Sequence, residues 1–437
     1  MLLEKLIGGV RLEPATSAAI AEDYERLSAG LPPRLEEYVR DRYRLDLTSE
    51  YGGRRVKNPF GKASGQLSLN TRQVRGDADA GLGFVVLKTI IAEDAAGGQS
   101  MSEWAIPETH MSVEPITGED GTRGWNVTWK GRGWSDTFDA YLRLFAESLE
   151  LGRGAGMLVV PSCKYHLPTA EEGEWRVGEY EHTTRRLLDV WEAGGGAPGG
   201  AAMPIEKDFS PTLAGSDRAA QAETVRRWMT AVTGLIREAA APRPVAVGVK
   251  LFNARFEDDF QLEMLRLLNE ECGGGGRPDF IVYANRLFDP EREYKGKRGV
   301  AYGGPDLSAR NLRVLARLRA LEQRGEIPRC EFPVSATGDI GSGRTAAEYL
   351  LRGASTFQMH TYFQLPNEEY RMRGGSRTER ALHELYFNPE RGLVACLLRL
   401  RLRLGWPEAL SVAGMAAYCA DPANGLWAAA EPSLARA

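Results

Sequence analysis

Hydrophobic residues in the central part of the chain gather in short runs rich in Val and Ile, and longer amphipathic segments separate these runs. This alternation is typical of repeated βα units that build a parallel sheet. Eight runs have the length and composition of buried strands, at 59–64, 83–89, 157–162, 201–206, 245–251, 279–284, 332–337 and 354–359. Helical patterns lie between them, at 71–80, 136–151, 182–193, 218–240, 257–271, 307–325 and 344–352. The sequence therefore predicts an α/β fold, a (β/α)8 TIM barrel.

Helical patterns also flank the barrel. Residues 1–45 are expected to form an N-terminal helical extension, with short amphipathic helices on either side of Pro32 and Pro33. The barrel itself is assigned to residues 46–365, and residues 366–437 to a helical C-terminal tail. The tail contains the basic apolar run GLVACLLRLRLRLGWPEAL, in which arginines recur every second residue. This spacing spoils a clean amphipathic face, so packing on the barrel is favoured over docking to a membrane or a quinone.

Composition and charge narrow the classes of partner. With 43% hydrophobic and 26% charged residues, the chain can bury a sizeable core and is not disordered. The 55 Lys and Arg residues against 59 Asp and Glu residues give a net charge of −4. Such a balance offers no basic surface for nucleic acid or anionic lipid. We therefore expect a small-molecule substrate.

Cysteine spacing and hydropathy exclude further classes. The five cysteines are scattered without a C-x-x-C pair, so neither a zinc site nor an iron–sulfur cluster is expected, and no metal is assigned. The cysteines are interpreted as reduced thiols. No run approaches the roughly 20 apolar residues that span a bilayer, and the start MLLEKLIGGVRLEP lacks the apolar core of a signal peptide. We therefore expect a cytoplasmic protein without a membrane span.

Polar residues stand at the carboxyl ends of the predicted strands, where barrels place their chemistry. Two of them are lysines, Lys88 and Lys250, each closing a run of Val and Leu. Such a lysine must either reach water or meet an anion in the barrel mouth. The other strand-end residues are Ala63, Ser64, Thr89, Asn285, Thr337, Gly338, His360 and Thr361.

The segment 333–361 places Gly338, Gly341 and Gly343 directly before a predicted helix. Backbone N–H groups in such a loop, together with the positive end of the helix, favour an anion, and barrels often bind phosphate after strands seven and eight. Glycines also serve turn geometry, so the cluster has a purely structural interpretation as well.

Six motifs at and around the predicted strand ends are VKNPFGKASGQLSLN, AGLGFVVLKTI, VGVKL, YANRLFDP, VAYGGPDLSARNLRVL and SATGDIGSGRTAAEYLLRGASTFQMHT. These motifs resemble the flavin-dependent dihydroorotate dehydrogenase and dihydropyrimidine dehydrogenase family. They occur in order along residues 46–365. The resemblance implies an FMN-dependent oxidoreductase that acts on a CH–CH bond of a small polar ring, as in pyrimidine metabolism.

The resemblance also assigns residues. Lys250 would neutralise negative charge on the reduced flavin, and Lys88 would bond oxygens of flavin and substrate. Asn126 and Asn285 would contact the substrate ring. The residues implied to bind FMN are Ala63, Ser64, Lys88, Thr89, Lys250, Asn285, Gly303, Gly304, Thr337, Gly338 and Thr361.

The family places a Cys or Ser acid–base residue in the loop after strand four. Ser210, directly before Pro211, and Cys163, in VVPSCKYH, both qualify by type. If Cys163 followed strand four, the run at 201–206 would have no place in the barrel. We therefore assign the proton transfer to Ser210 and keep Cys163, which then falls on strand three, as the alternative.

The same loop departs from the family pattern. Lys207 or Asp208 replaces an Asn before the base, and Thr212 takes the substrate-facing position of an Asn after the proline. A site built to pair polar substrate edges discriminates against rings that leave its groups unpaired. Loss of two amides therefore argues for a ring other than orotate.

Two questions stay open on the sequence. Residues 90–135 form a long insertion with Trp104, Trp125, Trp129 and Trp134, which suits either a lid over the flavin or a subunit contact in a homodimer. No motif in the sequence identifies the electron acceptor. A second interpretation of the whole chain is a non-redox phosphate-binding barrel, a lyase or isomerase that uses Lys88 or Lys250 as Schiff-base or general base.

Overall fold

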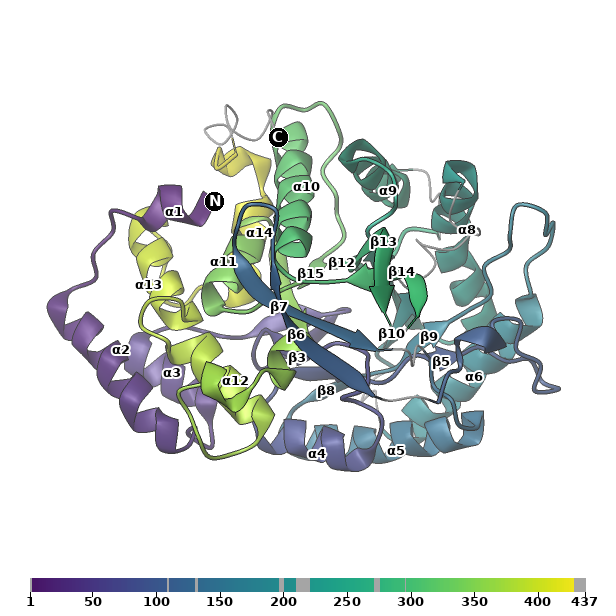
Figure 1. Cartoon of the computed structure of the whole chain (residues 1–437), viewed down its shortest axis with the longest axis horizontal. Helices are drawn as coiled ribbons and strands as arrows, with labels where there is room; N and C mark the ends of the chain where they lie inside the picture. Colours follow the sequence, from purple (N-terminus) through teal and green to yellow (C-terminus); the bar gives the residue numbers. More distant parts are fainter. Residues whose placement is uncertain are drawn as a thin grey trace.

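The computed structural model describes residues 2–107, 110–129, 133–195, 200–209, 221–270, 276–294 and 296–427. Its centre is a parallel barrel wrapped by helices (Figure 1). All eight predicted strands are present, two of them in two pieces. They are β3 (Phe60–Lys62), β4 (Phe84–Val86) with β5 (Ile90–Ile91), β8 (Leu158–Val160) with β9 (Ser162–Lys164), β10 (Met203–Asp208), β11 (Val245–Phe252), β12 (Phe280–Asn285), β15 (Val334–Thr337) and β16 (Ala354–Met359).

The barrel closes through the segment 158–164. Its first piece, β8, pairs with β4, and its second piece, β9, pairs with β5 and β10. Pro161 separates the two pieces, since proline cannot donate to a strand ladder. The other strands follow in the order β10, β11, β12, β15, β16, β3 and β4, all parallel. The predicted α/β TIM-barrel fold is confirmed.

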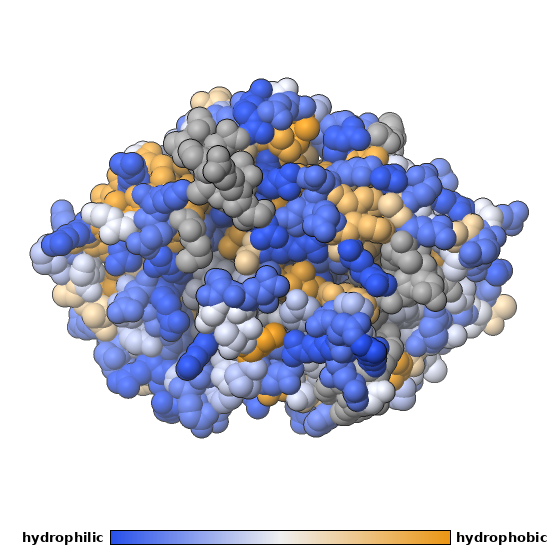
Figure 2. All heavy atoms as spheres, turned by 45° about the horizontal axis from the view of Figure 1, so that its top comes forward, coloured by the Kyte–Doolittle hydropathy of each residue, from blue (hydrophilic) through white to orange (hydrophobic). Residues whose placement is uncertain are grey.

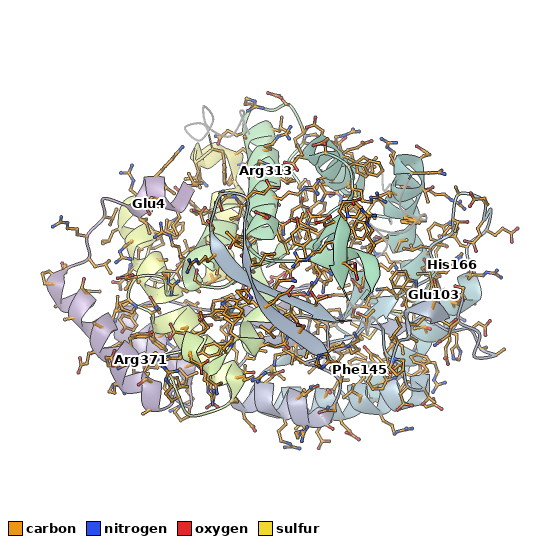
Figure 3. All side chains as sticks on the ribbon, viewed as in Figure 1. Glu4, Glu103, Phe145, His166, Arg313 and Arg371 are labelled. Carbon is orange, nitrogen blue, oxygen red and sulfur yellow. The ribbon has the colours of Figure 1, made fainter. Side chains whose placement is uncertain are left out.

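Helices connect successive strands, as the amphipathic patterns predict. They are α4 (Thr71–Asp79), α5 (Phe138–Ala155), α6 (Val177–Ala193), α8 (Ala222–Ala240), α9 (Asp258–Glu270), α10 (Pro305–Gln323) and α11 (Gly343–Leu351). Each buries its apolar stripe against the strands; Phe145 on α5, for example, is fully buried (Figure 3).

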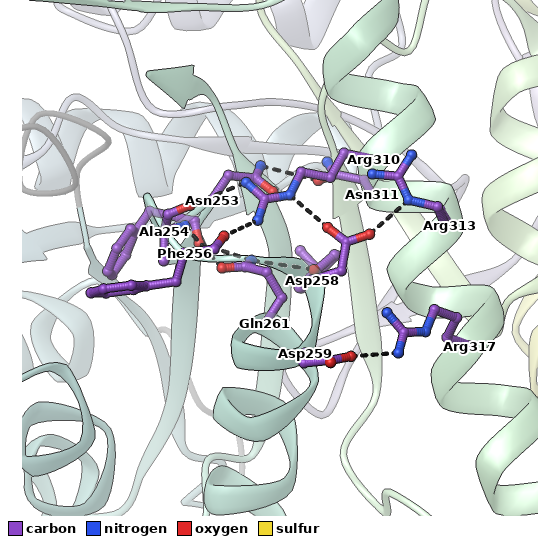
Figure 4. A network of polar contacts seen from close by, with 12 residues as sticks. Asn253, Ala254, Phe256, Asp258, Asp259, Gln261, Arg310, Asn311, Arg313 and Arg317 are labelled. Carbon is purple, nitrogen blue, oxygen red and sulfur yellow. Dashed lines mark hydrogen bonds and ion pairs between the residues drawn. The ribbon is translucent and has the colours of Figure 1, made fainter. Parts of the chain in front are cut away.

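Neighbouring outer helices are also joined by charge. Asp258, at the start of α9, pairs with Arg310 and Arg313 on α10 at 2.9 and 2.6 Å (Figure 4). The Arg310 guanidinium also donates to the carbonyl oxygens of Ala254 and Phe256. These bonds fix the loop after β11 relative to α10, and with it one side of the barrel mouth.

Chain ends pack around the last strand and helix of the barrel. Helices α2 (Pro14–Arg26) and α3 (Leu35–Tyr43) lie on either side of the two prolines, and a short α1 (Leu2–Ile7) precedes them. The tail supplies α12 (Arg377–Phe387), α13 (Leu393–Leu404) and α14 (Val412–Ala420). Helix α13 packs on α11, and α14 on β16. The face seen in Figure 2 is largely hydrophilic with separate apolar patches, and within the described residues no helix is long and apolar enough to cross a membrane.

The amino end of the barrel is sealed by a small hairpin, β1 (Ser49–Tyr51) with β2 (Arg54–Val56). Tyr51 from this hairpin stacks on Phe84, with 4.5 Å between ring centroids. Phe84 lies over Gly61, where an added Cβ would come within 2.3 Å of its ring. Gly248 makes room for Phe280 in the same way, at 2.0 Å. The lower barrel is therefore a packed aromatic layer.

Two hairpins that the sequence did not predict cross the open end (Figure 1). One is β6 (Met111–Thr117) with β7 (Arg123–Trp129), inside the long insertion, and the other is β13 (Leu287–Tyr294) with β14 (Lys297–Tyr302), after β12. Glu114 of the first pairs with Arg292 of the second at 2.9 Å. The hairpins thus form a connected roof over the mouth.

Candidate functional site

A cavity of about 1300 Å³ lies at the carboxyl ends of the strands, beneath the roof. Small-molecule sites typically enclose roughly 300–1,000 Å³, so this space can hold a cofactor with a substrate. Every residue to which the sequence assigned FMN binding lines it: Ala63, Ser64, Lys88, Thr89, Lys250, Asn285, Gly303, Gly304, Thr337, Gly338 and Thr361. The fold therefore brings together residues spread over nearly 300 positions of the chain.

Two lysines give the floor of the cavity its charge. Lys250, on β11, is 3.8 Å from Glu206 Oε2, and Glu206 is itself held by Tyr51 and Gln358. Lys88 follows β4. Burial, together with the neighbouring ammonium groups of Lys164 and Lys250, lowers the pKa of Lys88 to about 7. Lys88 can therefore either hold or release a proton near neutral pH.

An ion pair and a chain of hydroxyl groups lie beside these lysines. Lys164 on β9 donates to Asp208 on β10, with 2.8 Å between Nζ and Oδ2. Thr89 Oγ1 lies 2.7 Å from the Ser64 hydroxyl, 3.0 Å from the Ser162 hydroxyl and 3.5 Å from Asp208 Oδ2. Within this part of the structure the polar groups hold one another in place before any ligand binds.

Side-chain direction on β10 distinguishes Asp208 from Lys207. Asp208 faces the cavity. Lys207 points the other way, and its ammonium donates to the carbonyl oxygens of Tyr165 and Asp208 at 3.2 and 3.4 Å. Of the two replacements that the sequence left open, Asp208 is therefore the one at the site, and Lys207 is not.

A loop suited to an anion lies on the other side of the cavity. Gly338 has a φ of +110°, and a Cβ there would lie 2.6 Å from Asn311 Nδ2. Ser342 caps α11 by accepting from Thr345 N at 3.1 Å. Gly304 precedes α10 with a φ of +93°. The amino ends of α10 and α11 therefore both face the cavity, and their backbone dipoles favour negative charge there.

Other residues of this loop serve the fold. A Cβ on Gly343 would come within 2.0 Å of Leu393 N, so this glycine allows α11 to approach the tail. The Thr337 hydroxyl donates to the Gln358 carbonyl oxygen at 3.1 Å. Asp339, between Gly338 and the helix, accepts from Ser308 at 3.3 Å, and burial raises its pKa to about 7.

Two residues that have no role in the sequence-based assignment also line the cavity, Arg286 and His360. Arg286 donates to the carbonyl oxygens of Val127 and Ala301 in the two roof hairpins, and burial lowers its pKa to about 10. Burial and the surrounding cations lower the pKa of His360 well below its usual value. His360 was visible as a strand-end residue, whereas Arg286 depends on hairpins that carry no sequence signal.

Four residues of the long insertion have distinct positions. Trp125 lines the cavity, while Trp104 and Trp134 are buried in the main hydrophobic core. Asn126 is buried in the roof, where it donates to Glu114 and Thr128 and accepts from Gly303 N, each at 2.9 Å. Its side chain thus joins the first hairpin to the loop before α10 and is not among the residues that line the cavity.

Of the two candidate acid–base residues, the structure describes only Cys163. Ser210 lies outside the described residues, as does Thr212. Cys163 is on β9, as the strand count predicts, between Ser162 and Lys164, which face the barrel interior. Its thiol is fully buried in the outer core, and burial raises its pKa. Cys163 therefore does not reach the cavity.

Among the described residues, no group of His, Cys, Asp and Glu could hold a metal ion.

No family model matches the sequence, and no curated protein matches it. Among solved structures, the chain is similar to DHODH from Eimeria tenella in complex with ferulenol, at 13% identity with a TM-score of 0.49. The alignment covers 90% of this chain and 97% of that chain. At this identity the function has to be argued from the cavity itself.

Proposed function

We propose that this barrel binds FMN and acts as an oxidoreductase on a CH–CH bond of a small polar ring. The observation that carries the proposal is the convergence of two lysines and an anion-binding loop on one cavity. The lysines suit the electron-rich edge of a flavin ring, and the loop suits a phosphate. A roofed cavity of about 1300 Å³ has room for the cofactor and a second, smaller ring.

The residues present fit FMN in chemistry as well as in size. Gly338 and Gly304 line the cavity near the amino ends of α11 and α10, and their φ values of +110° and +93° are ones that glycine adopts without strain. Asp339 beside them has the wrong charge for a phosphate when its carboxyl is ionised. With a pKa near 7, its carboxyl is partly protonated at neutral pH and can donate to a phosphate oxygen.

Bound FMN would supply hydride exchange with a carbon of the substrate. The protein would contribute three things. Lys250 would stabilise negative charge with its ammonium group, and the roof hairpins would exclude water. Ser210 remains our proposal for the residue that moves a proton at the adjacent carbon, because it stands in the sequence two residues after Asp208, which ends β10 and lines the cavity.

An absorbance spectrum of the purified protein tests the proposal. We expect a flavin band, release of FMN on denaturation, and rebinding of FMN by the apoprotein. A colourless protein that does not bind added FMN would overturn it. Gln99, in a separate surface pocket with Asp94 and Glu179, offers a control: Gln99→Ala should leave FMN binding unchanged.

The pKa of Lys88 favours a second candidate, the non-redox lyase or isomerase. An amine with a pKa of about 7 is partly neutral under physiological conditions and can form a Schiff base with a carbonyl substrate. Borohydride reduction in the presence of small aldehydes and ketones, followed by peptide mass spectrometry, would detect such an adduct on Lys88. Labelling of Lys88 in a colourless protein would favour this second function.

A further inference from the structure

Asp208 lines the cavity, and only one of its two carboxylate oxygens has a hydrogen-bond partner. Its Oδ2 accepts from Lys164 at 2.8 Å and lies 3.5 Å from Thr89 Oγ1. Its Oδ1 is buried and has no hydrogen-bond partner in the described structure. The side chain is only 9% exposed and lines the cavity. A buried acceptor without a partner costs free energy that a ligand can recover by donating to it.

The ionisation of Asp208 fixes the polarity of this position. Burial raises its pKa, but the ammonium groups of Lys164, Lys250 and Lys207 outweigh that effect and lower it to about 2. The group is therefore a carboxylate throughout the physiological range, and a carboxylate can only accept hydrogen bonds. An amide in the same place would accept with its oxygen or donate with its nitrogen, so it would tolerate either kind of ligand edge.

The charges around Asp208 limit which donors can approach. Lys164 already neutralises the carboxylate at close range, and Lys88 and Lys250 add further positive charge nearby. A ligand cation would be attracted by the carboxylate of Asp208. It would also be repelled by the ammonium groups of Lys164, Lys88 and Lys250 in a partly desolvated space. A neutral N–H group gains the same hydrogen bond without that repulsion.

We propose that Asp208 determines ligand specificity by accepting a hydrogen bond from a neutral N–H group through Oδ1. Ligands that present an oxygen or an alkylated nitrogen at this position are rejected, because two acceptors would then face each other. Ligand oxygens instead face Lys88 and Lys250. The inference deepens the proposed function, and it rests on that proposal only in taking this cavity as the ligand site.

Matched imides test this directly on the native protein. Succinimide and glutarimide carry one N–H between two carbonyl oxygens, and their N-methyl derivatives lack only that donor. Ligand-observed NMR titrations give the affinities, with the protein as purified and after saturation with FMN. We expect each N–H imide to bind at least about tenfold more tightly than its N-methyl partner, since a site built around a hydrogen bond rejects the analogue that lacks it.

Two variants separate hydrogen bonding from steric exclusion of the methyl group. Asp208→Asn keeps the size of the side chain but can donate, so the preference should fall close to unity. Glu369→Gln changes another carboxyl that lines the cavity, to which no role is assigned, and should leave the preference unchanged. If Asp208→Asn does not fold because Lys164 loses its partner, the double variant Lys164→Met with Asp208→Asn takes its place.

Three results would overturn the inference: equal affinity for the two members of a pair, no binding of either imide, or an undiminished preference in Asp208→Asn. The titrations without FMN keep this test separate from the proposed function. A protein that ignores FMN but prefers N–H imides would refute the flavin proposal alone. A flavin-binding protein without the preference would refute the role of Asp208 alone.

Discussion

Lys250 Nζ lies 3.8 Å from Glu206 Oε2 in the interior of the barrel, and both side chains are almost completely buried. Glu206 is held from the other side by Tyr51 and Gln358. The charge that Lys250 offers to a ligand is therefore already coupled to a carboxylate of the scaffold. Removing this lysine changes the stability of the barrel as well as the cavity.

We predict that Lys250→Met lowers the free energy of unfolding by about 3–5 kcal/mol, because it leaves Glu206 buried without its cation. The double variant Lys250→Met with Glu206→Gln should recover most of that loss. Neither variant should retain the FMN affinity of the native protein. Urea unfolding and quenching of flavin fluorescence measure the two quantities. A double variant that is stable and also binds FMN normally would show that Lys250 serves the fold alone.

The pKa of Lys88 predicts a pH dependence of anion binding. Lys88 carries its charge below about pH 7 and loses it above. The affinity for FMN should therefore fall as the pH rises through 7, and Lys88→Met should reduce this step to the part that Asp339, with its pKa of about 7, contributes. Lys207 is the matched control, since burial lowers its pKa to about 7 as well but its side chain points away from the cavity. Lys207→Met should leave the step in place.

Stability should respond to pH with a definite sign. The pKa of Lys88 is lower in the folded protein than its ordinary value of 10.5, so between about pH 7 and 10.5 the unfolded chain binds more protons. The contribution of Lys88 therefore makes the protein more stable as the pH rises through this window. Lys88→Met should flatten that rise in urea unfolding experiments. An unchanged slope would mean that Lys88 is not desolvated.

Alternation along the strands explains what the sequence could predict. The ends of the strands can be located in the sequence because Val-rich runs stop at Lys88 and Lys250. Their side chains can be placed together because parallel strands bring their carboxyl ends to one edge of the barrel. The same alternation shows why Ser162 and Lys164 face inward while Cys163 does not. From the letters SCK alone, the direction of each side chain depends on a register that only the closed barrel defines.

The sequence did not predict the two hairpins of the roof, for a different reason. The hairpin at 287–302 is rich in charged residues, and its strands are stabilised by partners such as Glu114 and Val127 far away in the chain. Such pairing leaves no local apolar period to detect. The positions of Arg286 and Asn126 depend on these hairpins, so the sequence alone could not predict them.

Burial of Cys163 predicts its reactivity. Its thiol is fully buried with a raised pKa, so little thiolate is available. Iodoacetamide should leave Cys163 unmodified in the native protein and modify it after unfolding, as peptide mass spectrometry can show. Rapid alkylation of the native protein would contradict the structure at β9.

Ser210 makes the complementary prediction. Ser210→Ala should retain bound FMN but lose turnover, whereas Cys163→Ala should lose neither. Flavin absorbance reports retention of the cofactor, and reduction of that absorbance by a substrate reports turnover. An active Ser210→Ala enzyme beside an inactive Cys163→Ala enzyme would reverse our assignment of the base.

Two glycines in helices of the barrel, Gly343 in α11 and Gly234 in α8, predict opposite effects of the same substitution. At Gly343 a Cβ would come within 2.0 Å of the backbone nitrogen of Leu393, so Gly343→Ala must push α11 away from α13. We expect a loss of about 1–3 kcal/mol or more in the free energy of unfolding. Gly234, inside α8, has no atom within 4 Å of its added Cβ.

Gly234→Ala should therefore stabilise the protein by about 0.5–1 kcal/mol, because alanine reduces the entropy lost when the helix forms. Thermal unfolding of the two variants beside the native protein measures both changes. The pair tests the packing of the tail specifically, since both substitutions add one methyl group to a helix. If Gly343→Ala were as harmless as Gly234→Ala, α13 could not lie against α11 as the structure places it.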